Sequence, residues 1–144
     1  MEYTEHTVCC ALRCGHKLWM SQRVNTPNFS EKWQFPGGKM DKKGETNPID
    51  AALREIKEET NLDIDINRLR YLMPIYGDKT TACCLVYYVD LNESEYPVRT
   101  ENVMTDWLLL TYDEAMAKDL MPGLAQSIRM LKDEKYWYNN MKKI

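Results

Sequence analysis

The chain has 144 residues and a formal net charge of −3, with 44% hydrophobic and 28% charged residues. This length suits one compact domain with a sizeable core, so we expect residues 1–144 to form a single domain. The slight acidic excess excludes the strong basic field that is typical of nucleic-acid-binding proteins. An anionic substrate would have to be met by local positive charge or by metal ions. No apolar run approaches the roughly 18–20 residues of a membrane span, so we expect no membrane partner.

The N-terminal part of the chain predicts a β-hairpin. Residues 4–14 are rich in β-branched and small apolar residues, Gly15-His16 marks a turn, and residues 18–24 alternate as a second strand. Residues 25–32 are polar and predict a loop. Residues 33–48 are so rich in turn-forming residues that we expect no long regular element there.

A helix over residues 48–60 is the clearest element. Asn47 is a favourable N-cap and Pro48 suits the first helical position. Asn61 can adopt the left-handed conformation that ends a helix. We expect the buried side of this helix to be formed by Ala51, Ala52 and Ile56, with Leu53 as a further candidate.

Three further strands are predicted in the second half of the chain. Residues 70–76 and 80–91 predict a strand pair that turns at Gly77-Asp78, and residues 92–102 predict a polar loop. Residues 103–110 predict another strand, with Trp107 inside it.

Two helices are predicted at the end of the chain. Thr111, with Glu114 three residues later, predicts a capped short helix. Pro122 predicts the start of a final helix that reaches about residue 135. The order of strands, a helix, more strands and then helices predicts an α/β (α+β) fold, in which helices pack on the faces of a mixed sheet.

Five cysteines lie at positions 9, 10, 14, 83 and 84, four of them as two adjacent pairs. Adjacent pairs lack the two-residue gap of a zinc knuckle, and an odd number makes a poor disulfide framework. We interpret the cysteines as small strand residues, some of which face the core. Reduced thiols, and an N-terminus without a basic and apolar leader, predict a cytoplasmic protein.

The chemistry concentrates in the sequence Arg-Glu-Ile-Lys-Glu-Glu within the first predicted helix. Glu55, Glu58 and Glu59 occupy helical positions i, i+3 and i+4 and therefore share a face. Neighbouring carboxylates repel one another unless a cation gathers them, and Mg²⁺ prefers carboxylate oxygens together with substrate phosphates. The alternative is a solvated acidic face paired with Arg54 and Lys57, which this short sequence taken alone favours.

The segment before this helix favours metal and phosphate binding. The Gly37-Gly38 pair allows a backbone carbonyl or N–H to approach a ligand without interference from a Cβ atom. Lys39 follows the pair and is a candidate partner for a phosphate or a carboxylate.

Together these features resemble the signature of the Nudix hydrolases. The matching residues are a glycine, a glutamate and an Arg-Glu-x-x-Glu-Glu helix, namely Gly38, Glu45, Arg54, Glu55, Glu58 and Glu59. Residues 33–39, Trp-Gln-Phe-Pro-Gly-Gly-Lys, are similar to the MutT-type branch, which hydrolyses nucleoside triphosphates to monophosphates and pyrophosphate. Arg23, ten residues before Trp33, also fits this branch. The resemblance implies a Nudix-like mixed β-sheet sandwiched between α-helices.

The loop half of the pattern is stretched. The spacings from Gly38 to Glu45 and from Glu45 to Arg54 are each one residue longer than in the family, and we place the additions at Lys42-Lys43 and Asn47. Loops absorb single insertions, whereas one extra residue in a helix would rotate the ligands by about 100°. The helix spacing is intact, so we expect the metal-binding face to be preserved.

The resemblance also implies a role for each residue of the site. One to three Mg²⁺ ions, or Mn²⁺ in their place, would be held by the carbonyl of Gly37 and the carboxylates of Glu55, Glu58, Glu59 and Glu101. Glu101 would come from the downstream loop, where Glu93 and Glu95 are also available. Either Glu55 or Glu101 would be the general base, and Glu45 would brace the loop through Arg54.

Contacts with the substrate are expected from Arg23, Gln34, Phe35 and Lys39. Arg23 would clamp a phosphate with its fixed fork of donors, and Lys39 would assist. Phe35, Trp33 or Tyr76 would stack on a base, although residues of this kind more often belong to the core.

The favoured function is Mg²⁺-dependent hydrolysis of a (d)NTP to a (d)NMP and pyrophosphate, by attack of water at phosphorus. The alternatives are hydrolysis of ADP-ribose, a dinucleoside polyphosphate or RNA 5′ ends, and a non-catalytic nucleotide-binding module. MutT-like proteins that prefer oxidised guanine use an asparagine just before the last helix. Residues 120–124 contain none, which argues against 8-oxo-dGTP as the substrate. The expected partner is a small nucleotide, and a monomer and a homodimer both remain open.

Overall fold

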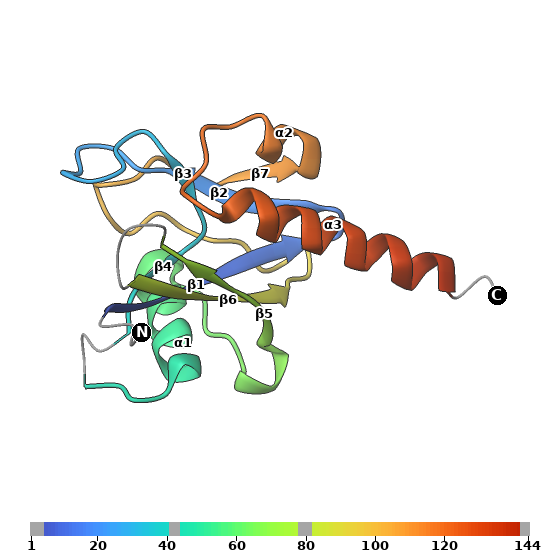
Figure 1. The fold of residues 1–144 in the computed structure, drawn as a ribbon, viewed down its shortest axis with the longest axis horizontal. Helices are drawn as coiled ribbons and strands as arrows, with labels where there is room; N and C mark the ends of the chain where they lie inside the picture. Colours follow the sequence, from blue (N-terminus) through green and yellow to red (C-terminus); the bar gives the residue numbers. More distant parts are fainter. Residues whose placement is uncertain (1–4, 41–43, 78–81, 142–144) are drawn as a thin grey trace.

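The computed structural model describes residues 5–40, 44–77 and 82–141. A seven-stranded mixed sheet forms its centre, in which β1 (Glu5–Cys14) pairs in parallel with β6 (Ala82–Asp90) and antiparallel with β2 (Lys17–Gln22). The main path through the sheet is β3-β2-β1-β6-β5, with β4 paired to β1 and β7 paired to β2 (Figure 1). The bounds of these four strands are β3 (Trp33–Gln34), β4 (Gly37–Lys39), β5 (Arg70–Tyr76) and β7 (Leu108–Thr111).

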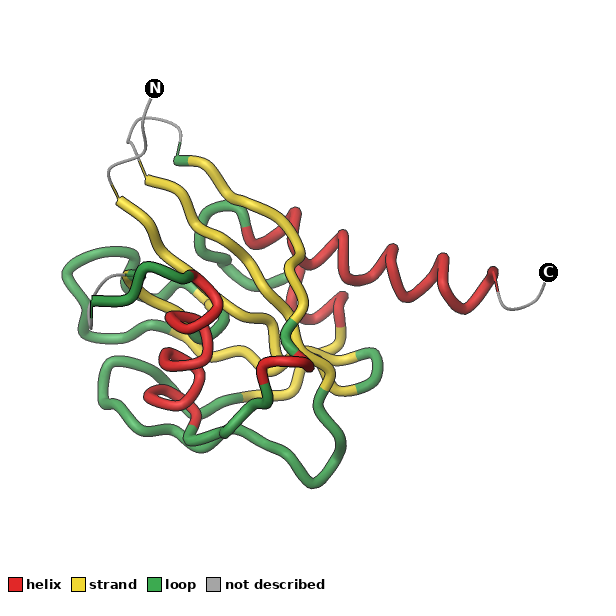
Figure 2. Tube along the Cα trace, turned by 90° about the horizontal axis from the view of Figure 1, so that it is seen from below, coloured by secondary structure: helices red, strands yellow, loops and turns green. Residues whose placement is uncertain are grey.

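Helices cover both faces of the sheet, which confirms the predicted fold class. The helix α1 (Pro48–Thr60) lies on one face, and α3 (Leu124–Met141) lies on the other and extends beyond the sheet (Figure 2). The short helix α2 (Tyr112–Met116) packs on the same side as α3, and a 3₁₀ turn (Ile66–Arg68) precedes β5.

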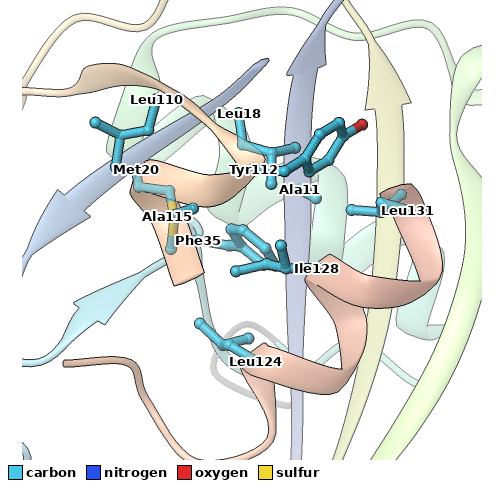
Figure 3. Packing of buried hydrophobic residues seen from close by; sticks show 10 residues of the cluster. All are labelled: Ala11, Leu18, Met20, Phe35, Leu110, Tyr112, Ala115, Leu124, Ile128 and Leu131. Carbon is cyan, nitrogen blue, oxygen red and sulfur yellow. The ribbon is translucent and has the colours of Figure 1, made fainter. Parts of the chain in front are cut away.

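Each face has its own buried hydrophobic cluster, and β1 contributes to both. Val8, Cys10 and Leu12 pack with residues of α1, whereas Ala11 packs with residues of α2 and α3. Successive side chains of a strand point to opposite faces of a sheet, so a strand buried on both sides has few polar positions. Figure 3 shows the second cluster, in which Phe35 lies against Ile128 of α3.

The ends of α1 follow the predicted local chemistry. Asn47 Oδ1 accepts a hydrogen bond from the backbone N–H of Ile49 at 2.9 Å, and Pro48 is the first helical residue. Asn61 has φ 63°, and its N–H donates to the carbonyl of Lys57. Ala51, Ala52 and Ile56 are buried as expected, whereas the further candidate Leu53 is only half-buried. The capping box of Thr111 and Glu114 at the start of α2 is also confirmed.

Two short strands lie where the sequence predicts irregular structure. β3 pairs with β2, and β4 pairs with β1 through the register Cys9↔Gly37. A Cβ atom on Gly37 would lie 2.3 Å from the carbonyl oxygen of Val8, so only a glycine permits this pairing. Lys42-Lys43, the expected place of one insertion, lies outside the described residues.

The prediction of a strand over residues 103–110 is wrong for the first half of this range. β7 contains only Leu108–Thr111, while residues 103–107 form an irregular segment. Its backbone bonds to the end of β2 instead of forming a ladder: Val24 N–H donates to Val103 O, and Thr105 N–H donates to Gln22 O, both at 2.9 Å. Trp107 therefore precedes the strand.

Other boundaries differ by a few residues. The final helix begins at Leu124, two residues after the predicted start, because Gly123 has a left-handed φ of 85°. It also continues beyond residue 135, to Met141. The second strand ends at Gln22, after which Arg23 makes an isolated bridge with Met104. Thr4, the turn residue Asp78 and residues 80–81 lie outside the described residues.

The five cysteines are free thiols that lie on β1 and β6, as predicted for small strand residues. Within the described part of the chain, no helix is both long enough and apolar enough to cross a lipid bilayer.

Candidate active site

The acidic face of α1 is largely buried. Glu55 is 2% exposed and Glu59 is 8% exposed, whereas Glu58 is 39% exposed. A buried carboxylate is costly unless it is paired or hydrogen-bonded. The alternative of a solvated acidic face is therefore wrong for two of the three glutamates.

Two glycines of β4 lie against these buried carboxylates. The backbone N–H of Gly37 donates to Glu59 Oε2 at 2.9 Å. A Cβ atom on Gly38 would lie 2.4 Å from Glu55 Oε1, so the missing side chain leaves the space that the carboxylate fills. The Gly37-Gly38 pair thus brings Glu55 and Glu59 to one short stretch of backbone.

Arg54 connects the helix to the preceding loop. Its Nε and Nη2 atoms both donate to the carboxylate of Glu45, which is the contact that the family resemblance implies. Its Nη1 atom donates to Glu55 at 3.0 Å and to Glu58 at 3.2 Å, and Nη2 also donates to the carbonyl of Lys39. The hydrogen bonds that Arg54 donates to Glu45 and Glu55 raise the pKa of its guanidinium above the ordinary value, against the opposing effect of burial. The Arg54 guanidinium thus offsets the mutual repulsion of the Glu45, Glu55 and Glu58 carboxylates.

The donor chemistry of this face suits a hard divalent cation, because carboxylate and carbonyl oxygens are the ligands that Mg²⁺ prefers. Across residues 5–40, 44–77 and 82–141, no three His, Cys, Asp or Glu side chains converge as a ready-made coordination sphere. Mg²⁺ commonly uses one or two protein carboxylates and completes its shell with water and substrate phosphates. The pair formed by Glu55 and Glu59 fits that kind of site.

A cavity of about 220 Å³ opens beside the two glycines. Arg23, Gln34, Gly37 and Gly38 line its polar side. Its apolar side is lined by residues that include Phe35, Ile75, Met121 and Leu124. The lining therefore combines polar groups, including the two glycines that contact the acidic helix, with apolar residues of β5 and of the region around the start of α3.

Arg23 is held in place on the polar side of the cavity. Its Nη1 atom donates to Gln34 Oε1 and its Nη2 atom donates to the carbonyl of Asn28, both at 3.2 Å. Its Nε atom is buried, and no described residue accepts a hydrogen bond from it. The guanidinium is thus oriented by two neutral acceptors, and no carboxylate of the described residues forms an ion pair with it.

The other expected substrate residues differ in their placement. Gln34 and Phe35 line the cavity, and Phe35 is also a core residue that is 3% exposed. Lys39 is exposed and is not among the described residues that line the cavity. Trp33 is half-buried outside the cavity lining, where Lys118 Nζ lies 4.8 Å from its ring, and Tyr76 is exposed at the end of β5.

The downstream glutamates separate into two groups. Glu95 accepts two hydrogen bonds from Arg68 at 2.7 Å, which lower the pKa of its carboxyl from 4.5 to about 2. Glu95 therefore stabilises the loop that contains it through these bonds to Arg68. Glu101 is exposed and directly follows Thr100, whose hydroxyl donates to the carbonyl of Glu58. This contact places the backbone beside Glu101 at the end of the acidic helix.

Several cavity residues were not predicted from the sequence. Cys9 and Cys84 lie on neighbouring strands with their Sγ atoms 3.7 Å apart, and both line the cavity. Met121 and Pro122 form part of the wall before α3. The alternation along β1 indicated that Cys9 shares the face of Ala11, but the approach of the α3 end to that face is a long-range feature without a local signal.

Comparison with known protein families matches the NUDIX domain over residues 3–131. No curated protein matches the sequence. Members of this family typically use divalent metal ions.

Solved structures share the fold at low sequence identity. The NUDIX domain of Shewanella oneidensis NrtR, co-crystallised with ADP ribose, aligns with a TM-score of 0.77 and 18% identity, over 93% of this chain and 90% of that one. The MutT NUDIX hydrolase of Burkholderia pseudomallei aligns with a TM-score of 0.71 and 19% identity, over 88% and 96%. A bifunctional NMN adenylyltransferase/ADP ribose pyrophosphatase of Francisella tularensis, complexed with AMP and a Mn ion, aligns at 0.69 and 18%, over 93% and 42%.

At these identities the structural similarity establishes the fold and leaves the branch of the family open. The family match covers nearly the whole described chain, including the acidic helix, the two glycines and the cavity. The chain belongs to the Nudix family of pyrophosphohydrolases, which hydrolyse nucleoside diphosphate-linked substrates.

Proposed function

We propose that the chain is a Mg²⁺-dependent pyrophosphohydrolase of the MutT-like branch, which converts a (d)NTP to a (d)NMP and pyrophosphate. The observation that carries this proposal is the continuity between the cavity and the acidic helix. Gly37 and Gly38 line the cavity, and the same two residues contact Glu59 and Glu55. A phosphate chain beside the glycines would meet the carboxylates while the base packs against the apolar residues of the lining.

The proposed metal ligands are the carbonyl of Gly37 and the carboxylates of Glu55, Glu58, Glu59 and Glu101, for one to three Mg²⁺ ions or for Mn²⁺. Bound Mg²⁺ would neutralise charge on the phosphates and acidify the attacking water. Arg54 supports this assignment because it holds Glu55 and Glu58 together through the same Nη1 atom. Glu55 or Glu101 would accept the proton of the water that attacks phosphorus.

Arg23 is the proposed phosphate clamp. Gln34 and Asn28 already orient the Arg23 side chain, which reduces the entropic cost of ordering it when a phosphate binds. Lys39 would assist from the exposed end of β4, and Glu45 would hold the loop through Arg54.

The base is proposed to bind between Phe35 and the wall before α3. This wall is formed by Met121 and Pro122, with Leu124 at the first position of α3. None of the three offers a side-chain hydrogen bond to a base edge. Gln34 is the lining residue whose amide can both donate and accept. The apolar character of the wall supports a substrate other than 8-oxo-dGTP.

Hydrolysis of ADP-ribose is the second candidate. The NrtR domain that aligns with a TM-score of 0.77 was crystallised with ADP ribose, which makes this compound the first alternative to test. The apolar cavity would then hold the adenine, with the diphosphate beside Gly37 and Gly38.

Product analysis over a panel of nucleotides tests both candidates. The panel contains the eight common NTPs and dNTPs, 8-oxo-dGTP and ADP-ribose, each incubated with and without Mg²⁺. Glu59→Gln removes a buried carboxylate of the proposed site, and Glu93→Gln, at an exposed loop position, is the matched control. Monophosphate plus pyrophosphate, lost in Glu59→Gln and retained in Glu93→Gln, supports the first candidate. AMP plus ribose 5-phosphate as the main products supports the second, and an absence of Mg²⁺-dependent turnover on every compound contradicts both.

The wider setting also remains a proposal. We propose a single domain over residues 1–144 that acts in the cytoplasm on a small nucleotide. Light scattering during size-exclusion chromatography distinguishes a monomer from a homodimer.

A further inference from the structure

The C-terminal end of α1 is capped by a distant segment of the chain. The last four carbonyl groups of a helix have no partner inside it and must be satisfied from elsewhere. Asn61 N–H bonds to the carbonyl of Lys57 at 3.0 Å, in the local turn. Residues 98–107, called the connecting segment below, supply the other three donors. These bonds are Thr100 Oγ1 to Glu58 O at 2.5 Å, Trp107 Nε1 to Glu59 O at 3.3 Å, and Val98 N to Thr60 O at 3.0 Å.

The connecting segment is also attached to the strand end that carries Arg23. Val24 N–H donates to Val103 O, and Gln22 exchanges two hydrogen bonds with Thr105, all at 2.9 Å. Between them, Arg23 forms a backbone bridge with Met104. The segment thus links the proposed metal-binding turn of α1 to the proposed phosphate clamp.

Trp107 makes the buried one of the two side-chain contacts. Its side chain is buried, and its hydrogen bond to the carbonyl of Glu59 is buried as well. The carboxylate of Glu59 is held at its other end by Gly37 N–H. Glu59 is therefore fixed at both its main chain and its side chain, and Trp107 supplies the main-chain half.

We infer that Trp107, together with Thr100, is a positioning residue that fixes the metal-binding turn of α1 so that Glu58 and Glu59 present their carboxylates correctly. The inference rests on the proposed metal-dependent function. Loss of the indole N–H removes the donor that Trp107 supplies to this buried carbonyl, so the last turn shifts and moves the carboxylates with it. Residues that orient metal ligands typically contribute 10- to 100-fold to metal affinity or activity.

The decisive comparison is between two tryptophan-to-phenylalanine variants. Trp107→Phe keeps an aromatic ring but removes the bonded N–H. Trp19→Phe makes the same chemical change on β2, where the indole Nε1 is buried and no described residue accepts its hydrogen bond. Each variant is first checked for cooperative thermal unfolding, and Mn²⁺ affinity is then measured from the electron paramagnetic resonance signal of the free ion. The Mg²⁺ concentration at half-maximal activity is the second readout.

Trp107→Phe is expected to weaken Mn²⁺ binding about tenfold and to raise the Mg²⁺ midpoint by a similar factor, while Trp19→Phe stays within about twofold of the wild type. Equal values for the two variants, with an active wild type, would overturn the inference and leave the proposed function in place. An inactive wild type would instead contradict the proposed function, while the Mn²⁺ comparison still decides the role of Trp107.

Thr100 provides an independent pair of variants if Trp107→Phe does not fold. Thr100→Val removes the hydroxyl that bonds to Glu58 O with little change in shape, and Thr100→Ser retains a hydroxyl. Weaker Mn²⁺ binding in Thr100→Val, restored in Thr100→Ser, supports the inference. Unchanged Mn²⁺ binding in Thr100→Val contradicts it.

Discussion

Replacement of Gly38 by alanine tests how the acidic helix is seated on β4. The new Cβ atom would lie 2.4 Å from Glu55 Oε1, 2.7 Å from its carboxyl carbon and 2.9 Å from Oε2. Ordinary van der Waals contact begins at 3.4 Å, so the carboxylate must move by about 1 Å. A displacement of this size in a catalytic group can cost about 100-fold in rate. We therefore expect Gly38→Ala to lower kcat/KM by about two orders of magnitude.

The stability of the same variant should change much less. The clashing atoms belong to the far end of a flexible side chain, which can turn away while the fold is kept. Gly37→Ala provides the contrast, because its Cβ atom would meet the backbone oxygen of Val8 at 2.3 Å and disrupt the pairing of β1 with β4. Gly37→Ala should therefore show a large fall in Tm, and Gly38→Ala a small one.

Steady-state kinetics and thermal unfolding of these variants are compared with Gly15→Ala. Gly15 also has no side chain, but nothing lies within 4 Å of its Cβ position, and its φ of 62° costs an alanine about 1–2 kcal/mol. This control should lose some stability and keep its activity. A kcat/KM for Gly38→Ala within threefold of the Gly15→Ala value would refute the proposed seating of Glu55.

Three further predictions concern other contacts. Arg23→Lys loses the fork held by Gln34 and Asn28 and should raise the KM for the nucleotide about tenfold, whereas Arg70→Lys, at an exposed position of β5, should not. Arg68 lowers the pKa of Glu95 to about 2, so their contact stabilises the fold fully above pH 4.5 and is lost as the pH falls toward 2. Over this pH range the Tm of Glu95→Gln should therefore decline less than the Tm of the wild type. Parallel declines would contradict the assignment. Buried Arg13 donates hydrogen bonds to Asp90 and Glu134, so Arg13→Ala should lower the free energy of unfolding by about 2–3 kcal/mol in urea titrations. An unchanged midpoint would show that α3 is held by its apolar contacts alone.

The helix α1 could be predicted in detail because its signals are local. Asn47 and Asn61 act within a few residues of the helix ends, and both perform the expected capping roles. The spacing of the glutamates agrees with the contact of Glu55 and Glu58 with one Nη1 atom of Arg54. It could not reveal that Glu58 is exposed while Glu55 and Glu59 are buried, because that difference depends on β4, a strand formed by pairing with distant β1.

The errors lie where long-range contacts decide the structure. A strand is predicted over residues 103–110 with Trp107 inside it, but the indole turns to the end of α1 and the backbone bonds to the end of β2. The apolar lining of the cavity comes from β1, β5 and the region around the start of α3, which no local pattern brings together. The acidic-helix half of the candidate site was therefore more predictable than the half formed by the cavity.

Hydrolysis of a nucleoside triphosphate in ¹⁸O-labelled water, with mass spectrometry of both products, tests the central claim most directly. The reaction is run with Mg²⁺ on the triphosphate that turns over fastest. Equal amounts of monophosphate and pyrophosphate are expected, with one ¹⁸O atom per turnover in one of the two products and no reaction when Mg²⁺ is removed. A nucleoside diphosphate and inorganic phosphate as products, or equal turnover without Mg²⁺, would contradict the account.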